Sequence, residues 1–155
     1  MNSLAELLSE GAVAAGVTVA GKKPLLALLA QGAEREYGLD AQDVIECLTE
    51  RERLGSTGFG NGIAIPHGKI AGLDHIVALF VHLAQPIDFQ AIDDMPVDLV
   101  FCLLSPPDAG ADHLKALAMV SRWFRDAAFV AKLRGAGSSD AAMAVIAGTK
   151  VRDAA

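Results

Sequence analysis

One histidine follows a glycine-rich stretch in the middle of the chain, in a setting that suits chemistry on phosphate groups. Residues 55–62 include four glycines, and a short apolar run and Pro66 then lead to His67. A neutral imidazole is a competent nucleophile near neutral pH, because its unperturbed pKa is about 6.5. His67 is therefore the candidate acceptor of a phosphoryl group.

The residues before His67 could supply donors to a phosphate. Backbone amides of a glycine-rich loop can approach an anion closely, and a guanidinium is the side chain best suited to clamp a phosphate. The candidate phosphate-binding residues are Ser56, Thr57, Gly60 and Asn61, with Arg51 and Arg53 at the end of the preceding helix. The residues alone leave open a plain loop, a histidine that only serves a turn, and arginines that interact with a helix dipole.

Spacing excludes two nucleotide-binding loops. A Walker loop has four residues between its first glycine and a Gly-Lys pair followed by Ser or Thr. Here five residues separate Gly62 from Gly68-Lys69, and neither Ser nor Thr follows. The dinucleotide fingerprint also fails, because Ile63 stands where the third glycine would follow Gly58-Phe-Gly60.

The rest of the chain predicts the elements that must position His67. Apolar residues at helical spacing predict helices, and runs rich in Val, Ile, Leu and Phe predict buried strands. The predicted helices cover residues 3–9, 22–37, 41–53, 111–125, 127–133 and 139–147, and the predicted strands cover residues 63–65, 75–83 and 97–104. Gly38 is expected to end one helix and Asp40 to cap the next. This order predicts an α/β fold of one domain, residues 1–155, with a mixed sheet sandwiched between helices.

Composition restricts the classes of partner and compartment. The formal net charge is −6 and no segment concentrates Lys and Arg, so nucleic acid is not an expected partner. The longest apolar runs fall far short of the roughly 18–20 residues that span a bilayer. Residues 1–20 also lack the basic start and apolar block of a secretory signal, so we expect a cytoplasmic protein without membrane insertion. Cys47 and Cys102 form neither a redox pair nor a zinc ligand set, and both are expected in the core.

The segment Gly55–Lys69, Gly-Ser-Thr-Gly-Phe-Gly-Asn-Gly-Ile-Ala-Ile-Pro-His-Gly-Lys, closely resembles a known active-site signature. It is that of the fructose/mannitol-type enzyme IIA of the bacterial phosphoenolpyruvate:sugar phosphotransferase system. The resemblance continues through Pro86–Phe89, Pro96–Phe101 and His113–Leu117 and covers nearly the whole chain. Within the family the sequence looks most like the nitrogen-regulatory IIA branch.

The resemblance implies a five-stranded mixed sheet flanked by helices, and it implies roles for three side chains. His67 would be the phosphorylated residue, Arg51 the active-site arginine, and His113 a second active-site histidine that hydrogen-bonds the phosphoryl group or the ring of His67. The implied donor is a small histidine phosphocarrier protein, and neither a cofactor nor a metal is expected. His75 and His82 are expected to be structural.

Three uses of such a site stay open. In a regulatory protein, phosphorylation changes which target proteins are bound; the resemblance to the nitrogen-regulatory branch favours this use. In sugar transport, the phosphoryl group passes to a IIB component. A different class would be a metal-dependent hydrolase that uses His67 and His113 as ligands, with Asp112 as the nearby candidate for the third ligand.

Overall fold

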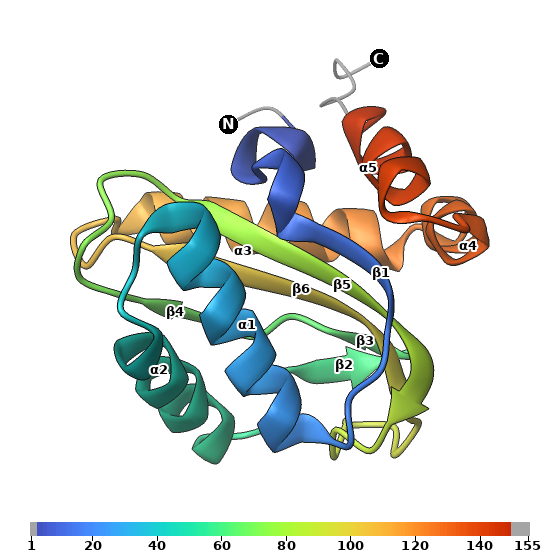
Figure 1. Ribbon diagram of the computed structural model, residues 1–155, viewed down its shortest axis with the longest axis horizontal. Helices are drawn as coiled ribbons and strands as arrows, with labels where there is room; N and C mark the ends of the chain where they lie inside the picture. The colour runs from blue at the N-terminus through green and yellow to red at the C-terminus, as the bar shows by residue number, and fades with distance from the viewer. Residues whose placement is uncertain (1–2, 150–155) are drawn as a thin grey trace.

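The computed structural model describes residues 3–149, so residues 1–2 and 150–155 of the expected domain lie outside the described part. A mixed sheet lies between helices, with α1 and α2 in front of it and α3 behind it (Figure 1). The elements are, in chain order, 3-10 turns η1 (Leu4–Leu7) and η2 (Glu10–Ala12), strand β1 (Val13–Val17), helices α1 (Lys22–Tyr37) and α2 (Ala41–Arg53), strands β2 (Gly58–Gly60), β3 (Ile63–Ala64), β4 (His67–Lys69), β5 (Val77–Ile87) and β6 (Val97–Ser105), and helices α3 (Ala111–Arg125), α4 (Ala127–Gly135) and α5 (Ser139–Ala147). The predicted single-domain α/β sandwich is confirmed.

The sheet places two short strands in succession along one side of β6. Its order is β1-β5-β6-β3-β2, and β4 also pairs with β6. β5 and β6 are antiparallel, whereas β1 is parallel to β5, and β3 and β4 are parallel to β6. Pro66, which lies between β3 and β4, still accepts a hydrogen bond from the Leu103 amide at 2.9 Å. His67 therefore opens β4, opposite Leu103 of β6.

The core holds α3 firmly on the back of the sheet. β6 is buried over almost its whole length, as expected for a strand with helices on both faces. The Phe124 ring of α3 lies 5.6 Å from the Phe101 ring of β6 and 5.5 Å from the Phe129 ring of α4, measured between centroids. This packing fixes α3, and with it the first turn that carries His113.

Local signals set the ends of the helices before the glycine loop. Gly38 ends α1 in the left-handed conformation with φ +68°, and the Asp40 carboxylate accepts a hydrogen bond from the Asp43 amide at 2.9 Å at the start of α2. Both predicted caps are confirmed. No helix within residues 3–149 is long and apolar enough to cross a membrane.

Some strands were not predicted, and some predicted elements were wrong in type or length. The strands β1, β2 and β4 were missed, because they are short or rich in Ala and Gly and so carry little strand propensity. Residues 3–9 contribute a single 3-10 turn rather than an α-helix. β5 runs on to Ile87, beyond the predicted end at residue 83, and its register shifts between His82 and Ile87 where Pro86 stands.

The two cysteines differ in burial. Cys102 is fully buried, as expected, but Cys47 is only half-buried and its Sγ donates to the Lys69 carbonyl oxygen at 3.4 Å. Burial raises the pKa of both thiols. Helix α2 lies so close to β4 that a Cβ atom at Gly68 would collide with the Cys47 sulfur.

Candidate functional site

The backbone of His67 lies between two sets of backbone hydrogen bonds, or ladders. On its amino side the Ile65 amide donates to the Thr57 carbonyl at 3.0 Å, which ties the segment to the glycine loop. On its carboxyl side β4 pairs with β6 from Leu103 to Ser105. The Pro66 ring removes one backbone donor and fixes φ between these ladders. The His67 backbone is therefore rigid while its ring is only half-buried.

The hydrogen bonds of His67 determine which ring nitrogen carries the proton. Nδ1 lies 2.8 Å from the Ile65 carbonyl oxygen, and a carbonyl can only accept, so Nδ1 is protonated. Nε2 then keeps its lone pair and accepts a hydrogen bond from Nε of Arg51 at 3.2 Å. Arg51 is itself held by a bond from Nη1 to the Gly55 carbonyl at 2.9 Å. Neutral His67 thus presents Nε2 as a nucleophile beside a fixed guanidinium.

His113 lies next to His67. The two ring centroids are 5.8 Å apart, and His113 is 8% exposed in the first turn of α3. Its Nδ1 shares a 2.6 Å hydrogen bond with Oγ of Ser105, the fully buried last residue of β6. Within residues 3–149, Nε2 of His113 has no hydrogen-bond partner, yet no buried side-chain nitrogen or oxygen there is left unsatisfied, so this nitrogen reaches solvent.

Both histidines favour the neutral form. Burial lowers the pKa of His67; the bond to Ile65 and the charge of Glu52 oppose this shift, and the charge of Arg51 adds to it. Burial also lowers the pKa of His113, with further lowering by His67 and Lys69. At neutral pH the pair is therefore uncharged, which leaves Nε2 of His67 available for bonding.

The polar side chains at the start of the glycine loop bond within the protein. The Ser56 hydroxyl donates to the Phe89 carbonyl at 2.9 Å and accepts from the Gly58 amide at 3.1 Å. The Thr57 amide and hydroxyl both donate to the Glu52 carboxylate. These groups shape the loop, and an anion would compete with Glu52 for the Thr57 donors.

The remaining two loop candidates are Gly60, the last residue of β2, and Asn61, in the turn between β2 and β3. The backbone amide of Asn61 donates to the Asp93 carboxylate at 3.0 Å, and the backbone carbonyl of Asn61 accepts from Nη2 of Arg134 at 2.6 Å. A Cβ atom at Gly60, whose φ is +114°, would lie 3.3 Å from the Asp93 carboxylate. The contacts of Asn61 and Gly60 are thus with the β5–β6 loop and α4, whereas Arg51 and His113 contact His67.

Sequence reasoning missed Ser105 and Glu52. Ser105 is a polar residue at the end of an otherwise apolar strand, directly before Pro106, and that contrast was the available signal. Glu52 stands in a run of alternating charges, Glu50–Arg53, in which nothing distinguishes a buried carboxylate from exposed ones. The burial of the Glu52 carboxylate depends on its contact with α1, and the residue that makes this contact is distant in sequence.

The other histidines and the possible third metal ligand lie apart from this arrangement. His75 pairs with Asp74 on the exposed surface, and His82 lies 3.8 Å from the Asp98 carboxylate, which Arg134 also contacts. Within the described residues 3–149, no group of three or more His, Cys, Asp and Glu side chains is placed to hold a metal ion. Asp112 therefore does not complete a ligand set with His67 and His113.

Comparison with protein families defines the class. Residues 6–148 match the family described as "Phosphoenolpyruvate-dependent sugar phosphotransferase system, EIIA 2". The chain therefore belongs to this family, and the resemblance carried by Gly55–Lys69 is confirmed.

Individual relatives confirm the resemblance to the nitrogen-regulatory branch. A "Nitrogen regulatory protein" from Bradyrhizobium diazoefficiens is 44% identical over 144 residues, which cover 93% of this chain and 94% of that protein. The crystal structure of nitrogen regulatory protein IIA-Ntr from Neisseria meningitidis has a TM-score of 0.86 at 36% identity, covering 92% of this chain and 98% of that one. A complex of enzyme IIAMTL with phosphorylated enzyme IIBMTL from Escherichia coli shares the fold, with a TM-score of 0.73 at 19% identity, covering 92% and 99%.

Proposed function

We propose that this protein is a cytoplasmic phosphoryl carrier whose His67 accepts a phosphoryl group, at Nε2, from the phosphohistidine of a small carrier protein. The observation that carries the proposal is the bond from Nδ1 of His67 to the Ile65 carbonyl. It holds the proton on one nitrogen and leaves a lone pair on the other. As the new bond between phosphorus and His67 forms, the bond between phosphorus and the donor nitrogen breaks.

Arg51 and His113 are suited to stabilise the transferred group. The guanidinium of Arg51 already lies at Nε2, so it can pass from the ring nitrogen to the phosphoryl oxygens. Nε2 of His113 can donate to the same oxygens once Ser105 fixes the ring through Nδ1. Phosphoryl transfer demands mainly positioning and charge stabilisation, which these two side chains supply.

The N-terminus of α3 adds an electrostatic field that favours an anion. Its N-cap is Gly110, which offers no side chain to the amides of the first turn. A helix N-terminus favours a nearby anion, typically by a few tenths to about one kcal/mol when exposed. A phosphoryl group on His67 would lie close to this end because His113 belongs to the first turn.

Exposed apolar residues beside the site offer contact area for the donor. Leu54, directly after α2, is 85% exposed, and Leu114, directly after His113, is 67% exposed. Contiguous exposed apolar patches mark protein interaction sites, and we propose that Leu54 and Leu114 belong to one such surface. A carrier protein that covers both would bring its phosphohistidine over His67.

We assign the carrier a regulatory role, in which phosphorylation of His67 changes the binding of target proteins. Support comes from the names of its full-length relatives, which are nitrogen regulatory proteins. The second candidate is sugar transport through a IIB component, because a protein of the same fold forms a complex with phosphorylated enzyme IIBMTL. Deleting the gene and measuring growth on fructose or mannitol separates the two, since loss of uptake supports transport.

The proposed transfer is tested with phosphorylated carrier protein. We expect the purified chain to become phosphorylated on His67, as mapped by mass spectrometry at alkaline pH. The exposed His75 provides the matched control, so His75→Ala should accept the group and His67→Ala should not. Transfer that survives in His67→Ala would overturn the proposal.

A further inference from the structure

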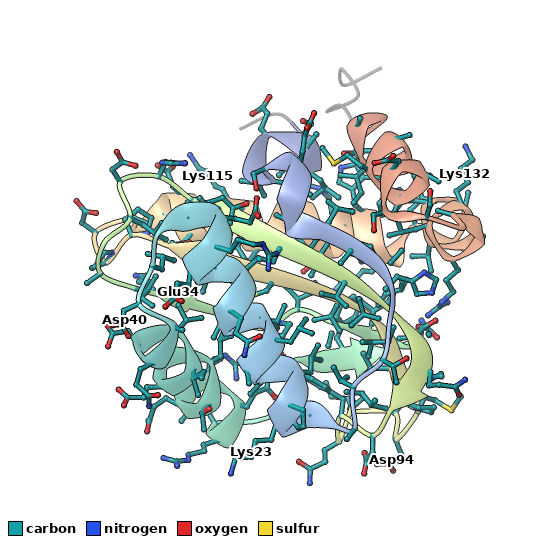
Figure 2. The ribbon with its side chains drawn as sticks, in the orientation of Figure 1. Lys23, Glu34, Asp40, Asp94, Lys115 and Lys132 are labelled. Carbon is teal, nitrogen blue, oxygen red and sulfur yellow. The ribbon has the colours of Figure 1, made fainter. Side chains whose placement is uncertain are left out.

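A largely buried ion pair lies next to the glycine loop. Nζ of Lys22, at the start of α1, is 2.7 Å from Oε2 of Glu52 in α2. The Glu52 side chain is only 7% exposed and that of Lys22 is 19% exposed. The neighbouring Lys23 points away from the protein in Figure 2, so only one of two adjacent lysines turns inward. A buried pair of this kind demands good geometry, since desolvation of both charges must be offset.

The Glu52 carboxylate is directly connected to the glycine loop. Besides Lys22, it accepts from the Thr57 amide at 3.3 Å and from the Thr57 hydroxyl. Lys22 in turn donates to the Phe89 carbonyl at 3.3 Å and lies 4.5 Å above the Phe89 ring. The Ser56 hydroxyl donates to that same carbonyl. The pair therefore joins α1, α2, the glycine loop and the β5–β6 loop.

From Thr57 the connection continues to the reactive histidine through backbone groups. The Thr57 carbonyl accepts the Ile65 amide at 3.0 Å, and the Ile65 carbonyl accepts Nδ1–H of His67 at 2.8 Å. Displacing Thr57 would therefore displace the carbonyl that selects the His67 tautomer. Glu52 also follows Arg51 directly in the sequence. Both partners of the His67 ring, the Arg51 guanidinium and the Ile65 carbonyl, therefore depend on the same turn of α2.

We infer that Glu52, held by Lys22, is a positioning residue that keeps His67 in the tautomer with the proton on Nδ1 and its lone pair on Nε2. The inference rests on the proposed function, because it explains how Nε2 is kept free for phosphorus. Glu52 acts through Thr57 and Ile65 and does not touch the transferred group. A glutamine at this position cannot reproduce the arrangement, because one of its two terminal atoms is a donor facing Lys22 or Thr57.

The test compares Glu52→Gln with Glu50→Gln, a matched control on the same helix whose side chain is 71% exposed and paired with Arg53. Imidazole ¹⁵N chemical shifts report the His67 tautomer without any phosphoryl donor, and transfer from phosphorylated carrier reports the rate. In Glu52→Gln we expect the tautomer protonated on Nε2 to appear and the rate to fall roughly ten- to a hundredfold. Glu50→Gln should change neither.

The outcomes separate the inference from the proposed function. If Glu52→Gln lowers thermal stability but leaves tautomer and rate unchanged, Glu52 is merely structural and the inference is overturned. If the tautomer responds to Glu52 while wild-type protein accepts no phosphoryl group, the positioning role holds and the proposed function fails. Should Glu52→Gln not fold, Lys22→Gln removes the ion pair that holds the Glu52 carboxylate. A tautomer unchanged in folded Lys22→Gln would also overturn the inference.

Discussion

The Arg51 guanidinium donates from Nε to Nε2 of His67 at 3.2 Å, so it occupies the ring nitrogen that we propose as the phosphoryl acceptor. One lone pair cannot serve both, and Arg51 must therefore leave the ring nitrogen when phosphorus arrives. The planar fork of the guanidinium suits this change, because it can exchange one nitrogen acceptor for phosphoryl oxygens without moving far. In the proposed transfer, Arg51 would cover Nε2 of His67 beforehand and contact the phosphoryl oxygens afterwards.

Replacing Arg51 by lysine should lower the rate of transfer by about a hundredfold, because a single ammonium cannot contact Gly55 and the phosphoryl group together. The rate is measured by rapid quench with phosphorylated carrier. Arg53→Lys serves as the control, since Arg53 is 70% exposed and pairs only with Glu50 among the contacts described. An Arg51→Lys rate equal to that of the wild type would contradict this role.

Ser105→Ala should destabilise the fold and slow transfer. The substitution removes the partner of His113 Nδ1 in a buried setting, which costs about 1–3 kcal/mol, and it frees the ring to turn away from His67. Urea unfolding and the transfer rate give the two readouts. Ser138→Ala, which removes the cap of α5, should cost about 1 kcal/mol and leave the rate unchanged. A wild-type rate in Ser105→Ala would show that His113 needs no such support.

The stability of the fold should fall as pH falls below about 6.5. Burial lowers the folded-state pKa of His67 and His113, so between about 6.5 and the lowered values the unfolded chain binds more protons than the folded one. The free energy of unfolding therefore decreases with decreasing pH in this window, and these groups add no slope above it. Unfolding measured across this range should show a shallower slope in His113→Gln. An unchanged slope would contradict the assignment.

Gly68→Ala should destabilise the protein by about 1–3 kcal/mol, because the added Cβ meets the Cys47 sulfur. Removing that sulfur in the double variant Cys47→Ala/Gly68→Ala should restore much of the loss. The four proteins form a double-mutant cycle that is read by urea unfolding. Additive effects of the two substitutions would show that α2 and β4 do not pack as described.

The sequence predicted the elements whose own residues specify them. α1, α2 and α3 show helical periodicity, Asp40 provides a cap, and β5 and β6 are long apolar runs. β1 could not be predicted in this way, because Val-Ala-Ala-Gly-Val becomes a strand only by pairing with β5, which lies far along the chain. Tertiary pairing overrides weak local propensity there.

The candidate site also combines residues that the sequence predicts with residues that depend on tertiary contacts. His67, Arg51 and His113 were found through a motif and a family resemblance, and the structure places their rings and guanidinium together. Glu52 was not predicted, because its burial results from tertiary contacts. Lys22, at the start of α1, pairs with its carboxylate, and the glycine loop folds over it. Asn61 was grouped with the site because it is near in sequence, although the β2–β3 turn directs its contacts to Asp93 and Arg134.

Everything proposed for this site depends on Nε2 of His67 receiving the phosphoryl group. The most direct measurement is ¹⁵N–³¹P NMR of the protein labelled with ¹⁵N-histidine and phosphorylated by its carrier. We predict that phosphorus couples to Nε2 of His67 and that Nδ1 keeps its proton, which it donates to the Ile65 carbonyl. Phosphorus on Nδ1, phosphorus on His113, or no phosphorylation at all would contradict it.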